Sequence, residues 1–190
     1  MIIGVPKEIK LQEHRIGLTP DSVKALTNRN HEVLVENNGG FEAGFTNEDY
    51  LEAGAKIIKT SEEIFEKAEL IVKVKEPQMN EVKMIKEGQI IYTYLHLAAA
   101  KELTLGLMKS KSICIAYETV TDDSGRLPLL APMSAVAGRM SVQAGAHALE
   151  KNQNGRGLLI GGAPGVEPAT VVILGGGVVG ENAAIIATGL

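Results

Sequence analysis

The sequence has little cysteine and no excess of basic charge. Its single cysteine, Cys114, cannot form a disulfide within the chain, which excludes the disulfide-rich class of small secreted domains. Lys and Arg number 19 against 23 Asp and Glu, so the formal net charge is −4, unlike the basic balance of nucleic-acid-binding proteins. No apolar run approaches the ~20 residues that cross a bilayer. The N-terminus also lacks the basic, apolar and cleavage segments of a signal peptide. These absences predict a cytoplasmic protein without nucleic-acid or membrane partners.

The sequence also lacks histidines at the spacing of metal ligands, because three of its four histidines, His14, His31 and His147, form no ligand pattern. No metal site is therefore expected. The hydrophobic share of 45% and the charged share of 22% are ordinary values for a globular protein. Glycine, with 21 of 190 residues, exceeds the usual ~7%. This excess gathers in the last third of the chain.

Short apolar runs alternate with segments of helical length over the first two thirds of the chain. Several of these segments begin with Ser, Thr, Asn or Asp, which are typical N-cap residues. Strands separated by helices predict right-handed βαβ units on a mostly parallel sheet. We therefore expect a doubly wound, Rossmann-like α/β domain over residues 1–128, with strands at 2–5, 32–36, 55–58, 70–74, 89–94 and 112–117 and helices at 20–30, 47–53, 61–68, 80–86 and 99–109.

Residues 129–190 follow a different pattern. Apolar residues spaced by three and four predict one long helix from Pro132 to about residue 151. Residues 155–168 are too rich in glycine and proline for a regular element, and residues 169–174 are expected to form a strand. A glycine turn and an apolar helix over 182–190 follow. Because a Rossmann half needs another strand after that helix, we expect a linking helix and the first βα unit of an incomplete, truncated domain.

The glycine turn has the spacing G-x-G-x-x-G at Gly175, Gly177 and Gly180. In this motif the first glycine makes the turn, the second admits a pyrophosphate, and the third allows close packing. The turn lies between an expected strand and an expected helix, whose N-terminus offers free N–H groups to phosphates. This context favours a dinucleotide site over a purely structural turn. The acidic residue that would distinguish NAD from NADP is expected ~20 residues further on, beyond Leu190.

Three side chains that could bind or protonate a small anion follow expected strands. Arg15 lies in the loop after the first expected strand, Lys75 stands at the end of the fourth expected strand, and His96 stands at the end of the fifth. Ligands of open parallel sheets bind at the carboxyl ends of strands. A guanidinium can hold a carboxylate through two hydrogen bonds, an ammonium supplies a point charge, and imidazole titrates near neutral pH. The sequence pattern leaves open the alternative that these are solvated charges and a structural histidine.

Six segments of the sequence together resemble the alanine dehydrogenase and transhydrogenase superfamily over all 190 residues. They are MIIGVPKEIKLQEHRIGLTP, KVKEP, YLHLA, AYETV, PLLAPMSAVAGRM and LLIGGAPGVEPATVVILGGGVVGENAA. Members are about twice as long, so the chain is similar to an N-terminal half. The resemblance implies a homo-oligomeric, typically hexameric, NAD-dependent oxidoreductase that converts L-alanine reversibly to pyruvate and ammonia.

The resemblance also implies roles for particular residues. Arg15 and Lys75 would bind the substrate carboxylate and carbonyl, and His96 would be the general acid and base. Leu130 and Met133 would line the nicotinamide and substrate pocket. The cofactor would contact Ser134, Gly175, Gly177, Val178, Val179 and Gly180. The catalytic aspartate of the superfamily falls outside this sequence, so the 190 residues alone are expected to be inactive.

Two other functions remain open at this point. The chain could be the NAD-binding part of a proton-translocating transhydrogenase, which shares much of the N-terminal pattern. It could also be a non-catalytic ligand-binding or assembly module. The transhydrogenase hypothesis gives Arg15, Lys75 and His96 no task, because that reaction has no amino-acid substrate.

Overall fold

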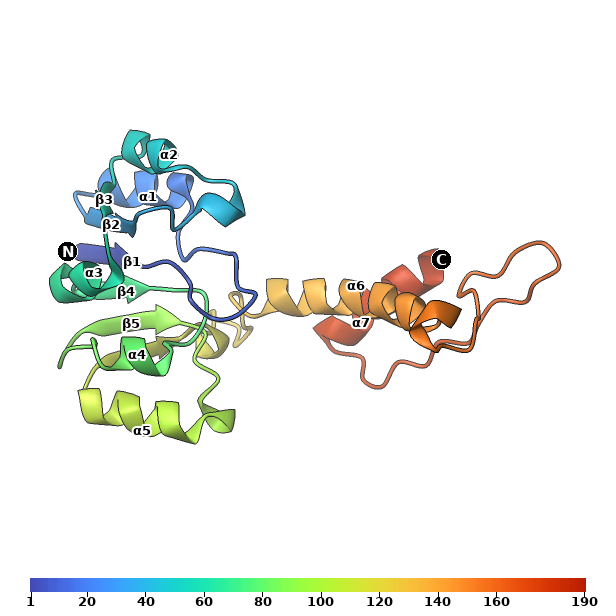
Figure 1. The fold of residues 1–190 in the computed structure, drawn as a ribbon. Helices are drawn as coiled ribbons and strands as arrows, with labels where there is room; N and C mark the ends of the chain where they lie inside the picture. Colours follow the sequence, from blue (N-terminus) through green and yellow to red (C-terminus); the bar gives the residue numbers. More distant parts are fainter. The chain divides into compact units, whose positions relative to one another are not determined.

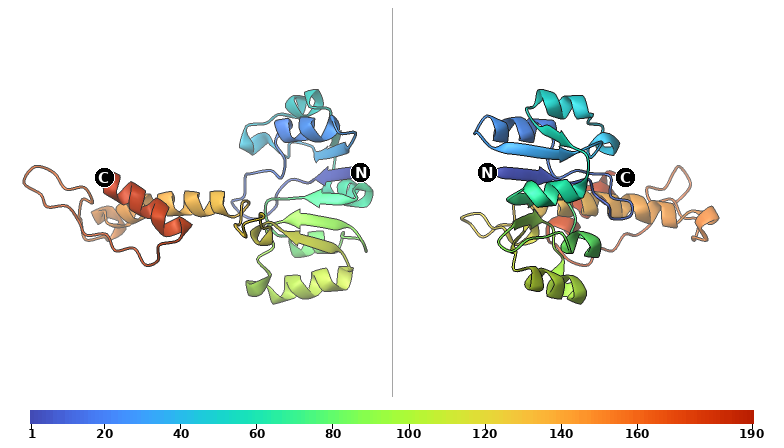
Figure 2. Two further views of the ribbon diagram at one scale, coloured as in Figure 1. Left: turned by 180° about the vertical axis from the view of Figure 1, so that it is seen from behind. Right: turned by 60° about the vertical axis from the view of Figure 1, so that its left-hand side comes forward.

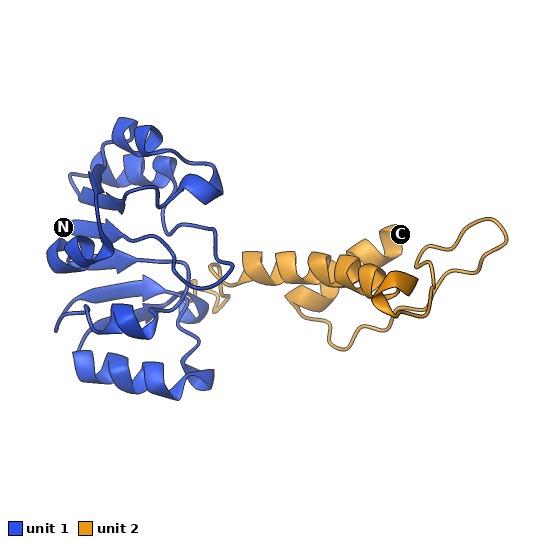
Figure 3. Ribbon diagram, viewed as in Figure 1, with its two compact units in different colours: residues 1–120 blue, residues 121–190 orange.

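A computed structural model describes residues 1–190, which form two compact units, residues 1–120 and residues 121–190 (Figure 3). The first unit contains a six-stranded sheet in which every paired strand is parallel. The order is β3-β2-β1-β4-β5-β6, the order of a doubly wound Rossmann fold. The strands are β1 (Ile2–Val5), β2 (Glu32–Glu36), β3 (Lys56–Ile58), β4 (Leu70–Val72), β5 (Ile90–Thr93) and β6 (Ile113–Ala116).

Capping residues that can be recognised in the sequence mark the N-termini of helices in the first unit. The Thr19 side chain accepts a hydrogen bond from the Ser22 amide, and Pro20 occupies the first turn of the next helix. Thr46 and Asp49 cap each other reciprocally. The helices are α1 (Pro20–Thr27), α2 (Asn47–Glu52), α3 (Ser61–Lys67), α4 (Met79–Val82) and α5 (Lys101–Ser110), with short 3-10 turns at Phe41–Ala43, Leu97–Ala99 and Tyr117–Thr119.

Alternate strand residues build two hydrophobic cores, one on each face of the sheet. Val33 and Val35 of β2 pack with α1 and α2, whereas Leu34 between them packs with α3, α4 and α5. The same alternation places Ile71 in the second core and Val72 in the first. Burial on both faces explains the continuous apolar runs of the central strands. Figures 1 and 2 show these strands side by side, with helices covering them.

The second unit contains two helices that pack along each other, α6 (Ala131–Ala148) and α7 (Val178–Gly189). Gly138 of α6 lies against the carbonyl of Val179, where an added Cβ would collide. Arg139 Nε donates to Asn182 Oδ1 at 3.1 Å across the pair. A 3-10 turn at Lys151–Gln153 and one isolated bridge between residues 163 and 166 are the other ordered features between the helices.

The predicted α/β fold and all six strands of the first unit are confirmed, with bounds shifted by at most two residues. The expected strand at 169–174 is wrong, because those residues form no ladder. A strand requires a hydrogen-bonded neighbour, and no other segment of residues 121–190 supplies one. The last helix begins at Val178 instead of residue 182, since Gly177 acts as its N-cap. No helix has the length and apolar character needed to cross a membrane.

Candidate functional site

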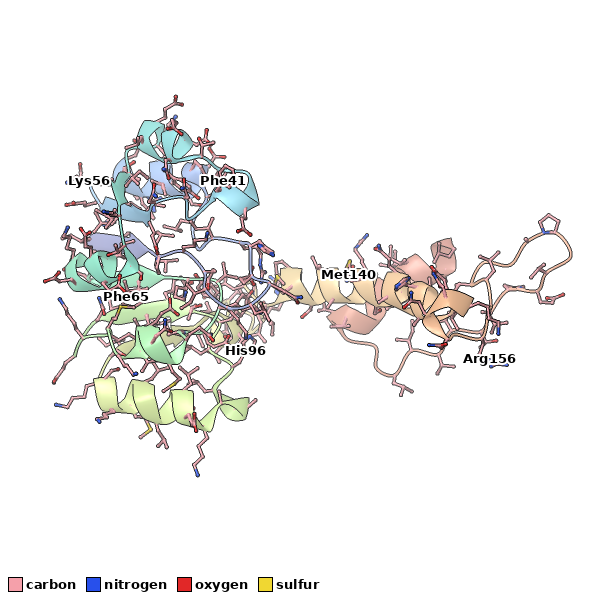
Figure 4. All side chains as sticks on the ribbon, viewed as in Figure 1. Phe41, Lys56, Phe65, His96, Met140 and Arg156 are labelled. Atoms are coloured by element: carbon pink, nitrogen blue, oxygen red, sulfur yellow. The ribbon has the colours of Figure 1, made fainter.

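The order of the sheet reverses between β1 and β4, the position beside which doubly wound proteins bind their ligands. Arg15 lies in the loop after β1, Lys75 follows β4, and His96 follows β5. Because β4 pairs with both β1 and β5, the three residues come from three adjacent strand ends. His96 is labelled at this edge of the sheet in Figure 4.

A buried charge cluster lies directly behind this edge. Lys73 is fully buried, and its Nζ lies 3.0 Å from Glu8 Oε2 and 2.9 Å from Glu81 Oε1. Burial raises the pKa of Glu81, although the Lys73 ammonium opposes that effect. Sequence reasoning missed this cluster. Lys73 has a structural role, since removing it would leave two carboxylates buried without their cation.

The same cluster fixes the main chain of Lys75. Glu8 Oε1 accepts hydrogen bonds from the Val74 amide at 2.5 Å and from the Lys75 amide at 3.2 Å. On the other side, Thr93 Oγ1 donates to the Lys75 carbonyl at 2.9 Å. The backbone of Lys75 is therefore held by both the β1 loop and β5. The point from which the Lys75 side chain extends is therefore fixed at this edge of the sheet.

Arg15 is held by a carboxylate of its own loop. Glu13 Oε1 accepts from Arg15 Nε at 2.7 Å and from the Arg15 amide at 3.0 Å, while Oε2 accepts from Nη2 at 2.5 Å. The hydrogen bond from Arg15 lowers the pKa of Glu13 to about 2, against burial, and the Lys75 charge adds to this lowering. Glu13 therefore lies within the field of both cations.

His96 has a left-handed backbone, with φ 51° and ψ 37°, which is uncommon for a residue other than glycine. Glu118, which follows β6, stabilises this conformation by accepting from the His96 amide at 2.8 Å and the Leu95 amide at 3.1 Å. Burial opposes ionisation of Glu118, but these amides lower its pKa overall. Tyr94 stacks on the imidazole, with the rings 6.0 Å apart and 13° from parallel. Glu118 was not predicted, although its place after a strand was a usable signal.

Tyr94 lies between Arg15 and His96 in the network of interactions, because it stacks on His96 and is affected by the Arg15 charge. Burial raises the pKa of its phenol, the Arg15 charge lowers it, and the Glu118 charge raises it. The Tyr94 ring also meets Tyr117 edge to face, with centroids 5.0 Å apart. The predicted residues of the first unit thus share one neighbourhood at the carboxyl edge. It contains two cations, an imidazole, and an aromatic wall.

The second unit contains a cavity of about 760 Å³ between its helices and the extended segment 169–174. Its lining includes all six residues expected to contact a cofactor: Ser134, Gly175, Gly177, Val178, Val179 and Gly180. Ser134 lies in the first turn of α6, and the glycines precede and enter α7. The structure therefore brings the two parts of the expected dinucleotide site together.

The glycines of this turn differ in their structural roles. Gly175 has φ +104°, a conformation that side chains rarely adopt, and Gly180 lies so close to the Gly175 carbonyl oxygen that a Cβ would collide. Gly177 instead faces open space. These features suit a tight turn, a close helix contact and an unobstructed approach to the first amides of α7. Such a site fits the pyrophosphate of a dinucleotide.

Leu130 and Met133 stand at the start of α6, where Leu130 is the N-cap and Met133 is partly exposed. Neither lines the cavity beside the glycine turn. The side chains of His, Cys, Asp and Glu form no group of three or more that could hold a metal ion.

Family models match nearly the whole chain. Residues 4–137 match the family described as alanine dehydrogenase/PNT, N-terminal domain, and residues 141–190 match its C-terminal domain. The chain belongs to the alanine dehydrogenase/PNT family. The predicted family membership is confirmed.

Several curated relatives in the alanine dehydrogenase/PNT family are named alanine dehydrogenase. Over all 190 residues, the chain is 56% identical to the protein of Halomonas elongata, 54% to that of Methanococcus maripaludis and 48% to that of Mycolicibacterium smegmatis. It spans about half of their length, 51% in each case.

Solved structures agree with the family assignment. One titled L-alanine dehydrogenase superposes with a TM-score of 0.91 at 53% identity, covering 100% of this chain and 52% of that one. A transhydrogenase from Sinorhizobium meliloti superposes with a TM-score of 0.80 at 22% identity, covering 99% of this chain and 54% of the other. The second likeness shows a shared fold alone.

Proposed function

We propose that the complete protein carrying this sequence is an NAD-dependent alanine dehydrogenase. It would catalyse the reversible oxidative deamination of L-alanine to pyruvate and ammonia. The observation that carries this proposal is the convergence of Arg15, Lys75 and His96 from three adjacent strand ends at the switch point of the sheet. Relatives named alanine dehydrogenase at 48–56% identity support the same reaction.

Each of these residues has a task suited to its chemistry. Arg15 would hold the substrate carboxylate, and Lys75 would face the carbonyl oxygen of pyruvate, where negative charge develops during addition of ammonia. Preorganised positive charge stabilises such an oxygen, and the hydrogen bonds on either side of Lys75 fix the point from which its side chain extends. His96 would transfer the proton of the carbinolamine step, a role commonly worth about 10²–10⁴ in rate.

The cavity of the second unit would hold the cofactor. Ser134 and the glycine turn, Gly175, Gly177, Val178, Val179 and Gly180, would bind its pyrophosphate, while Leu130 and Met133 would contact the nicotinamide and substrate. A Cβ at Gly177 would meet no atom within 4 Å, which leaves the start of α7 accessible to that group. NAD, when bound, supplies the hydride acceptor. The chain's own residues bind, orient and exchange protons.

The proposal extends to the state of the complete protein. We place it in the cytoplasm as a homo-oligomer, a hexamer by analogy with the superfamily, acting on small molecules. The lone cysteine and the negative net charge agree with this placement. Light scattering of the purified complete protein would measure its mass.

Spectrophotometry tests the reaction directly. The complete protein is incubated with NAD and L-alanine, and NADH is followed at its absorbance maximum. L-Alanine-dependent NADH formation, reversed by pyruvate with ammonium, is the expected result. Hydride exchange between NADH and an NADP analogue without L-alanine would instead favour a transhydrogenase. Absence of both activities would favour a non-catalytic module.

A further inference from the structure

Glu13 has no task in the proposed reaction, yet it contacts the proposed substrate clamp. Its side chain is only 8% exposed, whereas that of Arg15 is 43% exposed. Gln12, just before it, has φ +63°, so the loop turns sharply where Glu13 points inward. The Glu13 carboxylate accepts two hydrogen bonds from the guanidinium of Arg15, one from Nε and one from Nη2. The proposed anion site therefore contains an ion pair between Glu13 and Arg15.

The charge of Glu13 is permanent at any physiological pH. Its pKa is lowered to about 2, first by the Arg15 hydrogen bond and also by the Lys75 charge. Lys73 cannot offset this carboxylate, because it is buried between Glu8 and Glu81. Among Arg15, Lys75 and Glu13, two positive charges face one negative charge. The Glu8 carboxylate, which also acts on the Arg15 charge, adds negative charge behind the site.

We propose that Glu13 is a specificity-determining residue that restricts the site to substrates bearing a single negative charge. The inference rests on the proposed function, because it takes Arg15 and Lys75 as the anion-binding pair. A monocarboxylate such as pyruvate brings only the one negative charge that Arg15 and Lys75 would hold. A dianion places a second negative charge in the region of Arg15 and Lys75, where it meets the fixed Glu13 carboxylate. Such like-charge opposition is a common means of rejecting the wrong ligand.

Two probes of nearly equal size isolate this charge effect. Oxamate and oxalate are both flat two-carbon anions, but oxamate carries one negative charge and oxalate carries two. Each is titrated calorimetrically into the complete protein in the presence of NADH. We expect the wild-type protein to bind oxamate more tightly than oxalate. In Glu13→Gln, the ratio of the two dissociation constants should move toward oxalate by about tenfold or more.

Matched variants separate charge from structure. Glu48→Gln removes the same charge from an exposed position on α2 and should leave the ratio unchanged. Glu13→Asp retains the charge and should keep the preference for oxamate. A purely structural role for Glu13 would weaken both anions alike in Glu13→Gln and leave their ratio constant, which would overturn the proposal. Thermal denaturation of each variant verifies that it is folded.

The outcomes also distinguish this inference from the proposed function. L-Alanine-dependent NADH formation by the wild-type protein, with an unchanged anion ratio in Glu13→Gln, would refute the role of Glu13 alone. Failure of the wild-type protein to bind either anion would refute the anion site, and both proposals with it. Binding of oxamate without any alanine-dependent activity would leave the role of Glu13 standing while refuting the reaction.

Discussion

Lys75 and His96 illustrate how single residues at the carboxyl edge are fixed by neighbours distant in sequence. Glu8 and Thr93 hold the Lys75 backbone, and Glu118 holds the left-handed His96. The positions after strands could be predicted from sequence, because a parallel sheet gathers its carboxyl ends at one edge. The partners Glu8 and Glu118 could not, because the pairing depends on which backbone amides the loops leave facing the carboxylates.

Replacing either proposed catalytic residue should lower turnover by orders of magnitude. We expect Lys75→Ala and His96→Ala to reduce kcat for pyruvate amination by about 10²-fold or more. Lys83→Ala, at an exposed position after α4, is the matched control and should retain wild-type kinetics. Steady-state kinetics of the three proteins decide the matter. Equal losses in all three would contradict the assignment.

Arg15→Lys preserves charge but removes the planar fork of the guanidinium. We expect the KM for pyruvate to rise markedly, at a cost of a few kcal/mol at most, on the order of one charge-assisted hydrogen bond. The loss should fall on KM more than on kcat, because Arg15 would bind the carboxylate in both ground and transition states. An unchanged KM would show that Arg15 does not bind the carboxylate.

Lys73→Met should destabilise the protein, because Glu8 and Glu81 would lose their shared buried cation. Breaking a buried pair in this way costs about 3–5 kcal/mol. Urea denaturation followed by circular dichroism measures the change, with the exposed Lys83→Met as control. A loss equal to that of the control would contradict the structural role of Lys73.

Acid should weaken the fold partly through Glu13. Its pKa is ordinarily 4.5 and falls to about 2 in the folded protein, so the unfolded chain binds its proton first as pH falls. The stability from its ion pair is therefore present above pH 4.5 and is lost as pH falls toward 2. Glu13→Gln should show a shallower decline in the free energy of unfolding over that interval. Parallel curves for wild type and variant would contradict this.

At the scale of elements, the period of the apolar residues predicted the strands and helices of the first unit well. The sequence pattern gives a wrong prediction in two places, where the secondary structure depends on contacts with other segments. Residues 169–174 have a strand-like composition but no strand beside them, and Val172 and Leu174 are largely exposed. The start of α7 was misplaced because a glycine motif was expected to precede its helix, whereas Gly180 lies inside it.

Gly180→Ala should disturb the turn at the start of α7. The new Cβ would collide with the Gly175 carbonyl oxygen, so the turn would have to open. We expect NADH fluorescence titration of the complete protein to show binding weakened by about tenfold or more. Gly189→Ala, at the other end of the same helix with open space around it, is the control. Equal affinity in Gly180→Ala and wild type would remove the glycine turn from the cofactor site.

At the scale of the whole molecule, both hydrophobic cores lie within residues 1–120. That unit should therefore fold alone, whereas residues 121–190 bury few side chains and leave Val172 and Leu174 open to water. Hydrogen exchange of the 190-residue chain should show strong protection in β1, β4 and β5. It should show little protection over residues 155–177, where backbone hydrogen bonds are sparse. Equal protection throughout would contradict this division.

The same 190 residues, prepared alone, should be inactive with L-alanine and bind NADH weakly. Their exposed apolar side chains near α7 should also promote self-association. Light scattering and NADH fluorescence on this polypeptide measure both properties. A monomer that binds NADH with micromolar affinity would contradict the expectation.

The central place of β1 has a consequence for synthesis on the ribosome. Ile2–Val5 leave the exit tunnel before the other strands of their unit, yet β1 pairs with β4 as well as with β2. The nascent chain can add β2 and β3 on one side, but the other edge of β1 has no partner until Leu70–Val72 have emerged. Long-range parallel pairing of this kind is slow to form and exposes strand edges meanwhile. β1 must therefore wait, apolar and half-paired, for translation to pass the middle of its own unit.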